Sequence, residues 1–289
     1  MEDLQGPAVT NNDWTIVMDS SCDMPEKIGQ GGVDWVLAPL SVIVGEKEFV
    51  DDADLDVAEM MRAIKAYPGA ATSACPPVGV YAEAFRRSPN IICITITGSL
   101  SASYESALQA KEMVEAEDPT RNIHVIDSRA TSGKLTLIAE EAERLIEQGL
   151  SFNEVARKLD EYEDSTILFF SLASFDNLIK NGRMPKYQGM LGQVLKIRPV
   201  AYATKAGEIE ILDKPRGEKA MLRKMIERMK EFKSFEGLPV IISHCNAPEV
   251  VQKLKEHMEE AASVKSIRIM PTRGLCSFYT DDGGFIVGY

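Results

Sequence analysis

"IICITITGSLSASYESALQAKEMVEA", residues 91–116, contains a continuous apolar run, a loop rich in hydroxyl groups and an amphipathic stretch. The apolar run predicts a buried strand over residues 91–96, and the amphipathic stretch predicts a helix over residues 101–116. Another apolar run, "IHVID" (123–127), follows the helix. A strand, a helix and a second strand in this order are typical of neighbouring parallel strands in an α/β protein.

The same alternation extends through the first half of the chain, with strands predicted over residues 14–19 and 33–44 and helices over 56–67 and 133–149. The second half differs, because "RPVAYATKAGEIEILDKP" (198–215) predicts an antiparallel hairpin that turns at Ala206–Gly207. We therefore expect an α/β fold with two domains. The first, residues 13–163, would hold a mostly parallel sheet flanked by helices, and the second, residues 164–289, a mixed α/β arrangement.

Composition and net charge limit the kinds of partner, metal site and cellular location that we expect. The 289 residues carry a net charge of −12, which argues against nucleic acid and anionic membrane as partners. Five cysteines without a CxxC pair favour reduced thiols over a disulfide framework or structural zinc. No signal-peptide pattern and no apolar run of about 20 residues is present, so we expect a cytoplasmic protein without integral membrane association. We expect residues 1–12 to form a loose N-terminal tail.

Several catalytic patterns are missing from the sequence. It contains no GxxxxGK[ST] loop, no GxGxxG after the first strand and no HExxH. The three histidines are scattered; His244, which ends a predicted strand, is the best placed, and a structural role is the simpler interpretation. The pattern therefore predicts no metal, no cofactor and no catalytic residue.

Small polar residues instead gather beside predicted strand ends and helix starts. "DSSCD" (19–23) follows a strand, "ATSACPP" (71–77) precedes a helix, and both "TGSLSAS" (97–103) and "DSRATSG" (127–133) follow a strand and open a helix. Ligands of parallel sheets bind at the carboxyl ends of strands, where helix N-termini favour anions. The candidate carboxylate-binding residues are Thr72, Ser73, Thr97, Gly98 and Ser99.

Arg183, in "NGRMP", is the cation expected to face that anion site. The alternative interpretation is a surface arginine that follows a helix end. Helix capping is likewise the alternative for many of the hydroxyls, and Ser101, Ser132 and Asp54 suit N-caps.

In combination these segments resemble the DegV family of fatty-acid-binding proteins. "DSSCDMP" (19–25) resembles the family's D-S-x-x-D-L-P, and "APLSVIVGEKEFVD" (38–51) resembles P-L-x-V-x-x-G-x-x-[FY]-x-D. "TSACPP", "TGSLSASYESA", "DSRATSG" and "FDNLIKNGRMPKYQGMLGQVLKIRPV" follow in the family's order. The resemblance runs from about residue 14 to residue 289.

The resemblance implies one long-chain fatty acid held between two α/β domains. Thr72 and Ser73 match the family's T-S pair, Thr97 matches the first serine of its S-S pair, and Arg183 matches the arginine of its G-G-R motif. Members of the family are similar to the binding subunit of fatty acid kinase, which presents the acyl carboxylate to a separate ATP-binding subunit that makes acyl phosphate. Of the methionines near the last of these motifs, Met184 and Met190 suit either an adaptable tunnel or ordinary core.

The sequence departs from the family pattern at four places. "TSACPP" has one extra residue before its proline, Ala102 stands in the place of a glycine, and the other two departures concern the expected head-group site. Gly98 occupies the place of the second serine, so Ser99 or a backbone N–H is expected to make that contact. Tyr279, followed by Asp281 and Asp282, occupies the place of the histidine in the C-terminal H-x-G-x-G segment. The resemblance implies that this histidine lies near the carboxylate, so Tyr279 is also a candidate ligand-binding residue.

These departures leave two alternatives to fatty-acid binding. The first is a binding protein for a different amphipathic anion, which the changed C-terminal segment suggests. The second is a stand-alone acyl hydrolase or transferase with Ser99 or Cys75 as its nucleophile, although no histidine lies near either residue in the sequence.

Overall fold

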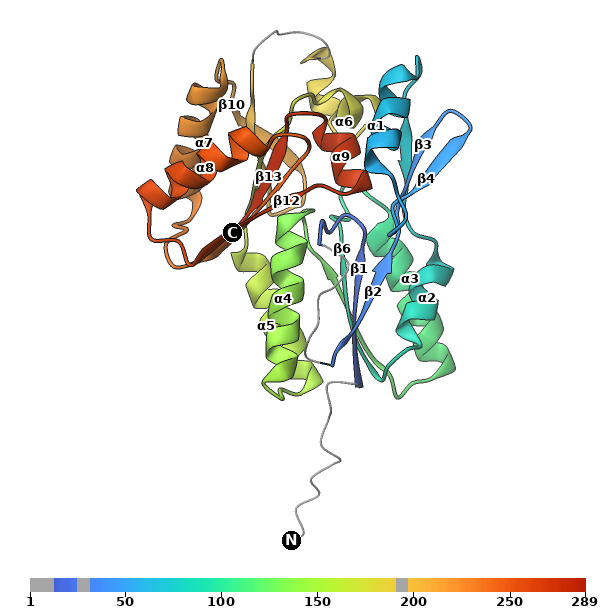
Figure 1. Cartoon of the computed structure of the whole chain (residues 1–289). Helices are drawn as coiled ribbons and strands as arrows, with labels where there is room; N and C mark the ends of the chain where they lie inside the picture. Colours follow the sequence, from blue (N-terminus) through green and yellow to red (C-terminus); the bar gives the residue numbers. More distant parts are fainter. Residues whose placement is uncertain (1–12, 25–31, 191–196) are drawn as a thin grey trace.

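The computed structural model describes residues 13–24, 32–190 and 197–289. The expected tail over residues 1–12 and the side chain of Met190 lie outside these described residues. Figure 1 shows a parallel sheet in the lower half of the molecule and a second sheet above it, with a smaller sheet beside them.

The lower sheet has four parallel strands in the order β2-β1-β6-β7. They are β1 (Trp14–Asp19), β2 (Asp34–Ala38), β6 (Asn90–Thr95) and β7 (Asn122–Asp127). Every residue of β1 and β6 is buried, which is why both segments read as continuous apolar runs.

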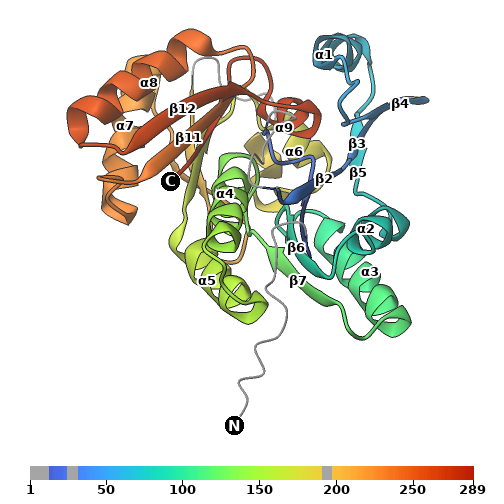
Figure 2. The ribbon, with the colours of Figure 1, turned by 60° about the horizontal axis from the view of Figure 1, so that its bottom comes forward.

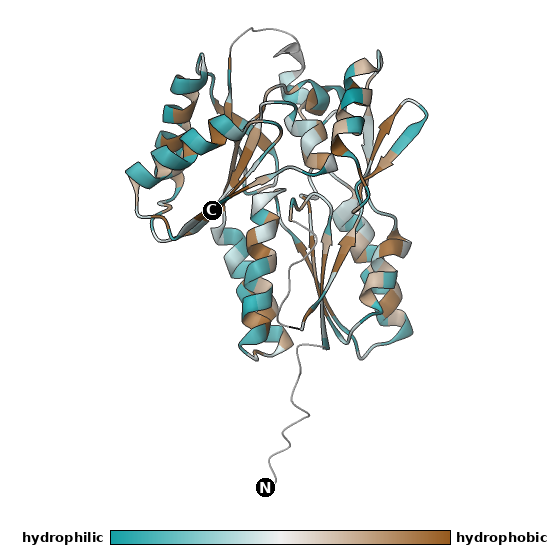
Figure 3. Ribbon diagram, in the orientation of Figure 1, coloured by the Kyte–Doolittle hydropathy of each residue, from teal (hydrophilic) through white to brown (hydrophobic). Residues whose placement is uncertain are grey.

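Helices cover both faces of this sheet (Figure 1). One face packs against α2 (Val78–Phe85) and α3 (Ser103–Glu117), and the other against α4 (Gly133–Glu147) and α5 (Phe152–Ser165). The helices contain both polar and apolar residues, whereas the strands between them are mainly apolar (Figure 3). This is the arrangement that the alternation of strands and helices predicts.

The upper sheet has six strands in the order β10-β9-β8-β13-β11-β12. They are β8 (Leu168–Ser171), β9 (Val200–Ala203), β10 (Ile209–Asp213), β11 (Pro239–His244), β12 (Ser266–Pro271) and β13 (Phe285–Gly288). Strands β9 and β10 are antiparallel, as the predicted hairpin requires. Helices α7 (Glu218–Phe232) and α8 (Pro248–Ala261) cover one face, and α4 touches β11 and β13 from the other side.

A three-stranded antiparallel sheet, β4-β3-β5, stands apart from the other two (Figure 2). Its strands are β3 (Ser41–Val44), β4 (Lys47–Val50) and β5 (Thr72–Ala74), and α1 (Val57–Ala66) packs on it. Between this small sheet and the upper sheet lie α6 (Asp176–Lys180), a 3-10 helix (Pro185–Met190) and α9 (Gly274–Thr280).

The predicted α/β class, with a parallel sheet first and an antiparallel hairpin later, is confirmed. The expected boundary between residues 163 and 164 falls in the last turn of α5, which ends at Ser165, and the division into domains at that point stays a prediction. In the part of the chain that the structure describes, no helix is both long enough and apolar enough to cross a bilayer.

Candidate ligand cavity

A cavity of about 350 Å³ lies where the carboxyl ends of the parallel strands meet the upper sheet and α9. Its lining is mainly apolar. The large apolar side chains on its walls are Leu40, Ile96, Leu100, Leu168, Phe170, Leu172, Leu178, Ile209, Leu275 and Ile286. The volume lies within the usual range of small-molecule sites.

Strand β8 builds one wall through the alternation of its side chains. Phe169 packs beneath α7 and α8, whereas Leu168 and Phe170 point the other way and line the cavity. The run "LFFS" is apolar at consecutive positions because both faces of this strand are covered.

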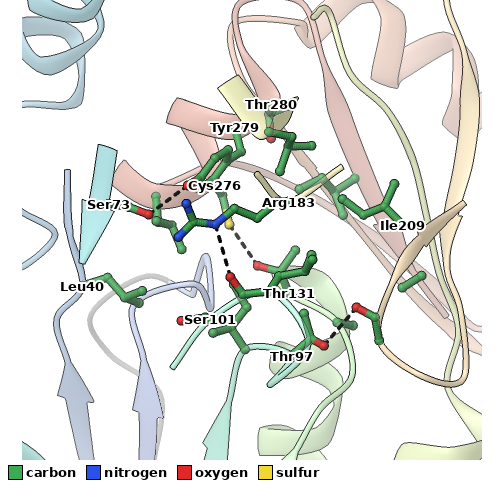
Figure 4. A pocket seen from close by; sticks show the side chains of 18 of the residues that line it. Leu40, Ser73, Thr97, Ser101, Thr131, Arg183, Ile209, Cys276, Tyr279 and Thr280 are labelled. Carbon is green, nitrogen blue, oxygen red and sulfur yellow. Dashed lines mark hydrogen bonds between the residues drawn. The ribbon is translucent and has the colours of Figure 1, made fainter. Parts of the chain in front are cut away.

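Three of the polar side chains that line the cavity, those of Ser73, Tyr279 and Arg183, lie close together (Figure 4). The hydroxyls of Ser73 and Tyr279 are hydrogen-bonded at 2.8 Å, and the Arg183 guanidinium lies 5.9 Å from the centre of the Tyr279 ring. Burial raises the pKa of the Tyr279 hydroxyl, so it stays protonated and can donate.

Arg183 is held by backbone oxygens. Its Nε donates to the Leu100 carbonyl at 3.3 Å and its Nη1 to the Asn181 carbonyl at 3.0 Å. Within the described residues no carboxylate forms an ion pair with this guanidinium. An arginine held in this way can still accept an anionic ligand.

The tip of the β9–β10 hairpin closes another part of the cavity. Thr97 is buried, and its hydroxyl donates to the Gly207 carbonyl at 3.0 Å (Figure 4). The Ser99 hydroxyl donates to the Ala206 carbonyl beside it. Gly207 has a φ of +76°, and a Cβ there would lie 2.0 Å from the Thr97 hydroxyl, so this close approach requires glycine.

The predicted carboxylate-binding residues therefore separate in space. Ser73, Thr97, Arg183 and Tyr279 line the cavity. Thr72, the neighbour of Ser73 in β5, is exposed and is not among the residues that line the cavity. Their contact with a ligand stays a prediction.

Gly98 and Ser99 do not line the cavity, although they are close to it in sequence. Gly98 is exposed, and its N–H donates to the Asp127 carboxylate at 3.1 Å. Because Ser99 is bound to the hairpin, neither residue supplies a free donor to the cavity in this structure.

Capping explains fewer of the hydroxyls than the sequence suggests. The N-cap of α1 is Asp56, and that of α3 is Ala102. Ser132 precedes α4 but makes no cap hydrogen bond; its hydroxyl donates to Asp23 at 2.5 Å. Ser101 accepts the Ser103 N–H at 3.2 Å and also lines the cavity.

The "DSSCD" loop (19–23) holds backbone and side-chain groups that lie next to the cavity. Asp19 is fully buried and accepts hydrogen bonds from the Ile96 N–H at 2.7 Å and the Ser103 hydroxyl at 2.6 Å. Burial raises the pKa of Asp19, and these hydrogen bonds act against that rise. The loop therefore positions the end of β6 and the start of α3.

Sequence reasoning missed Thr131 and Cys276 as lining residues. Their side chains are 3.4 Å apart, and the Cys276 thiol also donates to the Ser21 carbonyl at 3.2 Å. Thr131 lies within "DSRATSG", so its position after a parallel strand was the available signal. No local sequence pattern predicted helix α9, so none indicated that Cys276 lines the cavity.

The acids that follow Tyr279 are not among the residues that line the cavity. Asp282 accepts hydrogen bonds from Lys65 on α1 and from Asn246, the latter at 2.6 Å. The family's histidine is thus replaced by a neutral tyrosine without added negative charge in the cavity lining.

Among the described residues no cluster of histidine, cysteine and acidic side chains could hold a metal ion. His244 accepts the Ala247 N–H through Nδ1 at 3.1 Å, and His124 is paired with Asp160 at 2.8 Å. Both contacts are structural.

The comparison with known families decides the assignment. A family model described as "Uncharacterised protein, DegV family" matches residues 13–289. The chain belongs to the DegV family. It is also 39% identical over 277 residues to a DegV domain-containing protein of Streptococcus pneumoniae, covering 96% of this chain and 98% of that protein.

Two solved structures share this architecture over nearly the whole chain. The Streptococcus pneumoniae fatty acid kinase B3 protein, loaded with linoleic acid, is 38% identical with a TM-score of 0.91; the match covers 96% of this chain and 98% of that chain. A DegV protein of Eubacterium eligens, loaded with heptadecanoic acid, is 31% identical with a TM-score of 0.89, and the coverage is 95% and 98%. The resemblance read from the sequence and the two-domain DegV fold are confirmed.

Proposed function

We propose that this chain binds one long-chain fatty acid, with the acyl chain in the cavity and the carboxylate at Ser73, Tyr279 and Arg183. One observation carries the proposal. Of the described residues that line the apolar cavity, Arg183 alone is charged, and it lies next to the hydrogen-bonded Ser73 and Tyr279 hydroxyls. An apolar tail and a single negative charge match such a lining.

The energetics agree with this division of roles. Burial of about 14 methylenes, at roughly 0.8 kcal/mol each, offers about 11 kcal/mol of gross transfer free energy. A hydrogen bond to a charged group adds about 1.5–3 kcal/mol. The tail therefore dominates affinity, and the head-group contacts fix the orientation of the ligand.

The ligands of the related structures support the same class of molecule. Linoleic acid and heptadecanoic acid are both long-chain fatty acids, and each is bound by a relative that shares at least 31% of its residues with this chain. Chain length and unsaturation differ between the two, so the class of ligand carries over and the particular fatty acid does not.

We further propose that the protein presents the carboxylate to a separate ATP-binding kinase subunit in the cytoplasm. The support is the similarity to a fatty acid kinase B3 protein and the lack of a phosphate-binding loop in the sequence. In this scheme the chain is a binding subunit, and the transfer of phosphate to the fatty acid is the chemistry of its partner.

A hydrolase or transferase activity has less support. No histidine lies among the described residues that line the cavity. The Ser99 hydroxyl donates to a backbone carbonyl, and the Cys75 thiol lies 3.7 Å from the Ser106 hydroxyl. Neither nucleophile therefore has the adjacent base that such chemistry needs.

Mass spectrometry of the lipid extracted from the purified protein tests the proposal. We expect near-stoichiometric long-chain fatty acid. A different amphipathic anion in its place would favour the alternative binding function. Recovery of no lipid, together with no binding of added palmitate or oleate, would refute fatty-acid binding.

A pair of arginine variants tests the head-group end. Arg183→Gln is expected to weaken oleate binding by about tenfold or more, because it removes a charge-assisted contact. Arg62→Gln is the matched control, since Arg62 is exposed on α1 and does not line the cavity. Equal affinity of both variants would contradict the assignment of the carboxylate to Arg183.

A further inference from the structure

Helix α9 carries much of the cavity wall. Leu275, Cys276, Tyr279 and Thr280 all line the cavity, although the helix spans only Gly274–Thr280. The position of this short helix therefore decides where the Tyr279 hydroxyl lies.

Asp51 holds the N-terminus of α9 from below. Its side chain is fully buried, with Oδ1 accepting the Gly274 N–H at 2.9 Å and Oδ2 accepting the Leu275 N–H at 2.8 Å. The first N–H groups of a helix have no partner within the helix, and a negative charge there is favourable. Asp51 satisfies both groups, although 223 residues separate it from Gly274.

The junction between Asp51 and the start of α9 is tightly packed. A Cβ on Gly274 would lie 2.8 Å from the Asp51 carboxyl group and 2.4 Å from Leu55 Cδ2. The backbone N–H of Asp51 in turn donates to the Leu40 carbonyl at 2.8 Å. The carboxylate is therefore fixed between the β3–β4 hairpin and the start of α9.

The same small sheet also holds the far end of α9. Ser73, which bonds the Tyr279 hydroxyl, lies in β5 and pairs with Val42 of β3. Asp51 directly follows β4, whose Val50 pairs with Ser41 of β3. One three-stranded sheet thus fixes both ends of the helix, with a carboxylate at one end and a hydroxyl at the other.

We infer that Asp51 is a positioning residue for head-group binding: through α9 it sets the Tyr279 hydroxyl beside Ser73, so that the two hydroxyls form a pair in place for a carboxylate. Asp51 is not among the residues that line the cavity, so we infer that it acts through α9. The inference rests on the proposed function. It gives Asp51 a role in ligand binding in addition to its role as the cap of α9.

A double-mutant cycle tests the inference. Oleate affinity is measured for the wild type, Tyr279→Phe, Asp51→Asn and the double variant. Asparagine keeps the shape of the side chain but has one acceptor oxygen instead of two. We expect Tyr279→Phe to weaken binding three- to tenfold in the wild type and less than twofold in the Asp51→Asn background.

A merely structural Asp51 would lower thermal stability and leave the Tyr279→Phe effect equal in both backgrounds, and that result would overturn the inference. Met258→Ala is the control, because Met258 is buried in the α8 core of the upper sheet and its loss destabilises the protein without touching α9. The Tyr279→Phe effect should be unchanged in that background.

Gly274→Ala provides a second variant from the helix side of the same junction, should Asp51→Asn fail to fold. It should also reduce the Tyr279→Phe effect to less than twofold, and an unreduced effect would count against the inference. A wild type that binds no oleate and yields no lipid would refute the proposed function and this inference together. A wild type that binds oleate with additive effects of the two substitutions would refute the inference alone.

Discussion

Asp23→Asn should reduce the pH dependence of stability. Asp23 is 3% exposed, and it accepts hydrogen bonds from the Arg273 N–H at 2.7 Å and the Ser132 hydroxyl at 2.5 Å. Burial raises the pKa of its carboxyl group to about 7, while the two hydrogen bonds act against that rise. Asparagine can replace both contacts, because its oxygen accepts the Arg273 N–H and its NH₂ group can donate to Ser132.

The magnitude follows from linkage between proton binding and folding. In the unfolded chain an aspartate has a pKa of about 3.9, so it is ionised throughout the range from about pH 5 to about pH 8. The folded protein holds the proton at pH 5 and loses it as the pH rises through about 7. Stability therefore falls with rising pH, and the pKa difference corresponds to a loss of roughly 2.5 kcal/mol between about pH 5 and about pH 8.

Urea unfolding at several pH values across this range measures the effect. The free energy of unfolding of the wild type should fall more steeply with pH than that of Asp23→Asn, by the amount given above. Asp118→Asn is the control, because the Asp118 side chain is 43% exposed and its pKa is lowered by hydrogen bonds from Thr120, so it stays ionised over this range. Parallel curves for the wild type and Asp23→Asn would refute the argument.

The remaining predictions concern the hairpin and the small sheet. Thr97→Val removes the donor to Gly207, so it should cost about 1 kcal/mol in urea unfolding and speed the release of oleate in a displacement assay. Unchanged release would show that the hairpin does not limit exchange. Gly207→Ala should cost at least about 1 kcal/mol, since it places a Cβ against Thr97 at positive φ; a stability equal to the wild type would contradict the close approach. Lys65→Met should change stability by less than about 1 kcal/mol, because its ion pair with Asp282 is largely exposed; a larger loss would mean that this pair holds α9.

Local sequence patterns were sufficient to predict most of the strands and helices. The strand predicted over residues 91–96 is β6 (Asn90–Thr95), and the hairpin predicted to turn at Ala206–Gly207 joins β9 and β10. Both predictions rest on periodicity and turn residues that lie next to each other in the sequence. The short elements β5 and α9 were missed because their partners are distant: β5 has three residues that pair with β3, and the start of α9 is capped by Asp51.

Some of the residues that line the cavity could also be predicted from the sequence. Thr97, which follows a predicted parallel strand, and Ser73, which precedes a predicted helix, were both predicted to lie near a ligand, and both line the cavity. Ser73 itself lies in the antiparallel strand β5. The same reasoning could not separate Ser99, which does not line the cavity, from Thr97, which does. Both hydroxyls donate to the tip of the β9–β10 hairpin, 107 and 110 residues further along the chain. A hydroxyl that is satisfied by a long-range contact looks the same in sequence as one that is free.

The pairing of Ser73 with Tyr279 bears on how a binding subunit could release its ligand. The two hydroxyls hydrogen-bond each other at 2.8 Å, and the Arg183 guanidinium donates to two backbone carbonyls. Withdrawal of the head group would therefore leave no buried polar atom of these three residues without a partner, and the penalty of about 1–3 kcal/mol for such an atom would not arise. In the proposed function, the acyl chain can stay bound while the carboxylate leaves this site for the active site of a partner. A histidine at position 279 would change this balance, because its charge depends on pH near neutrality.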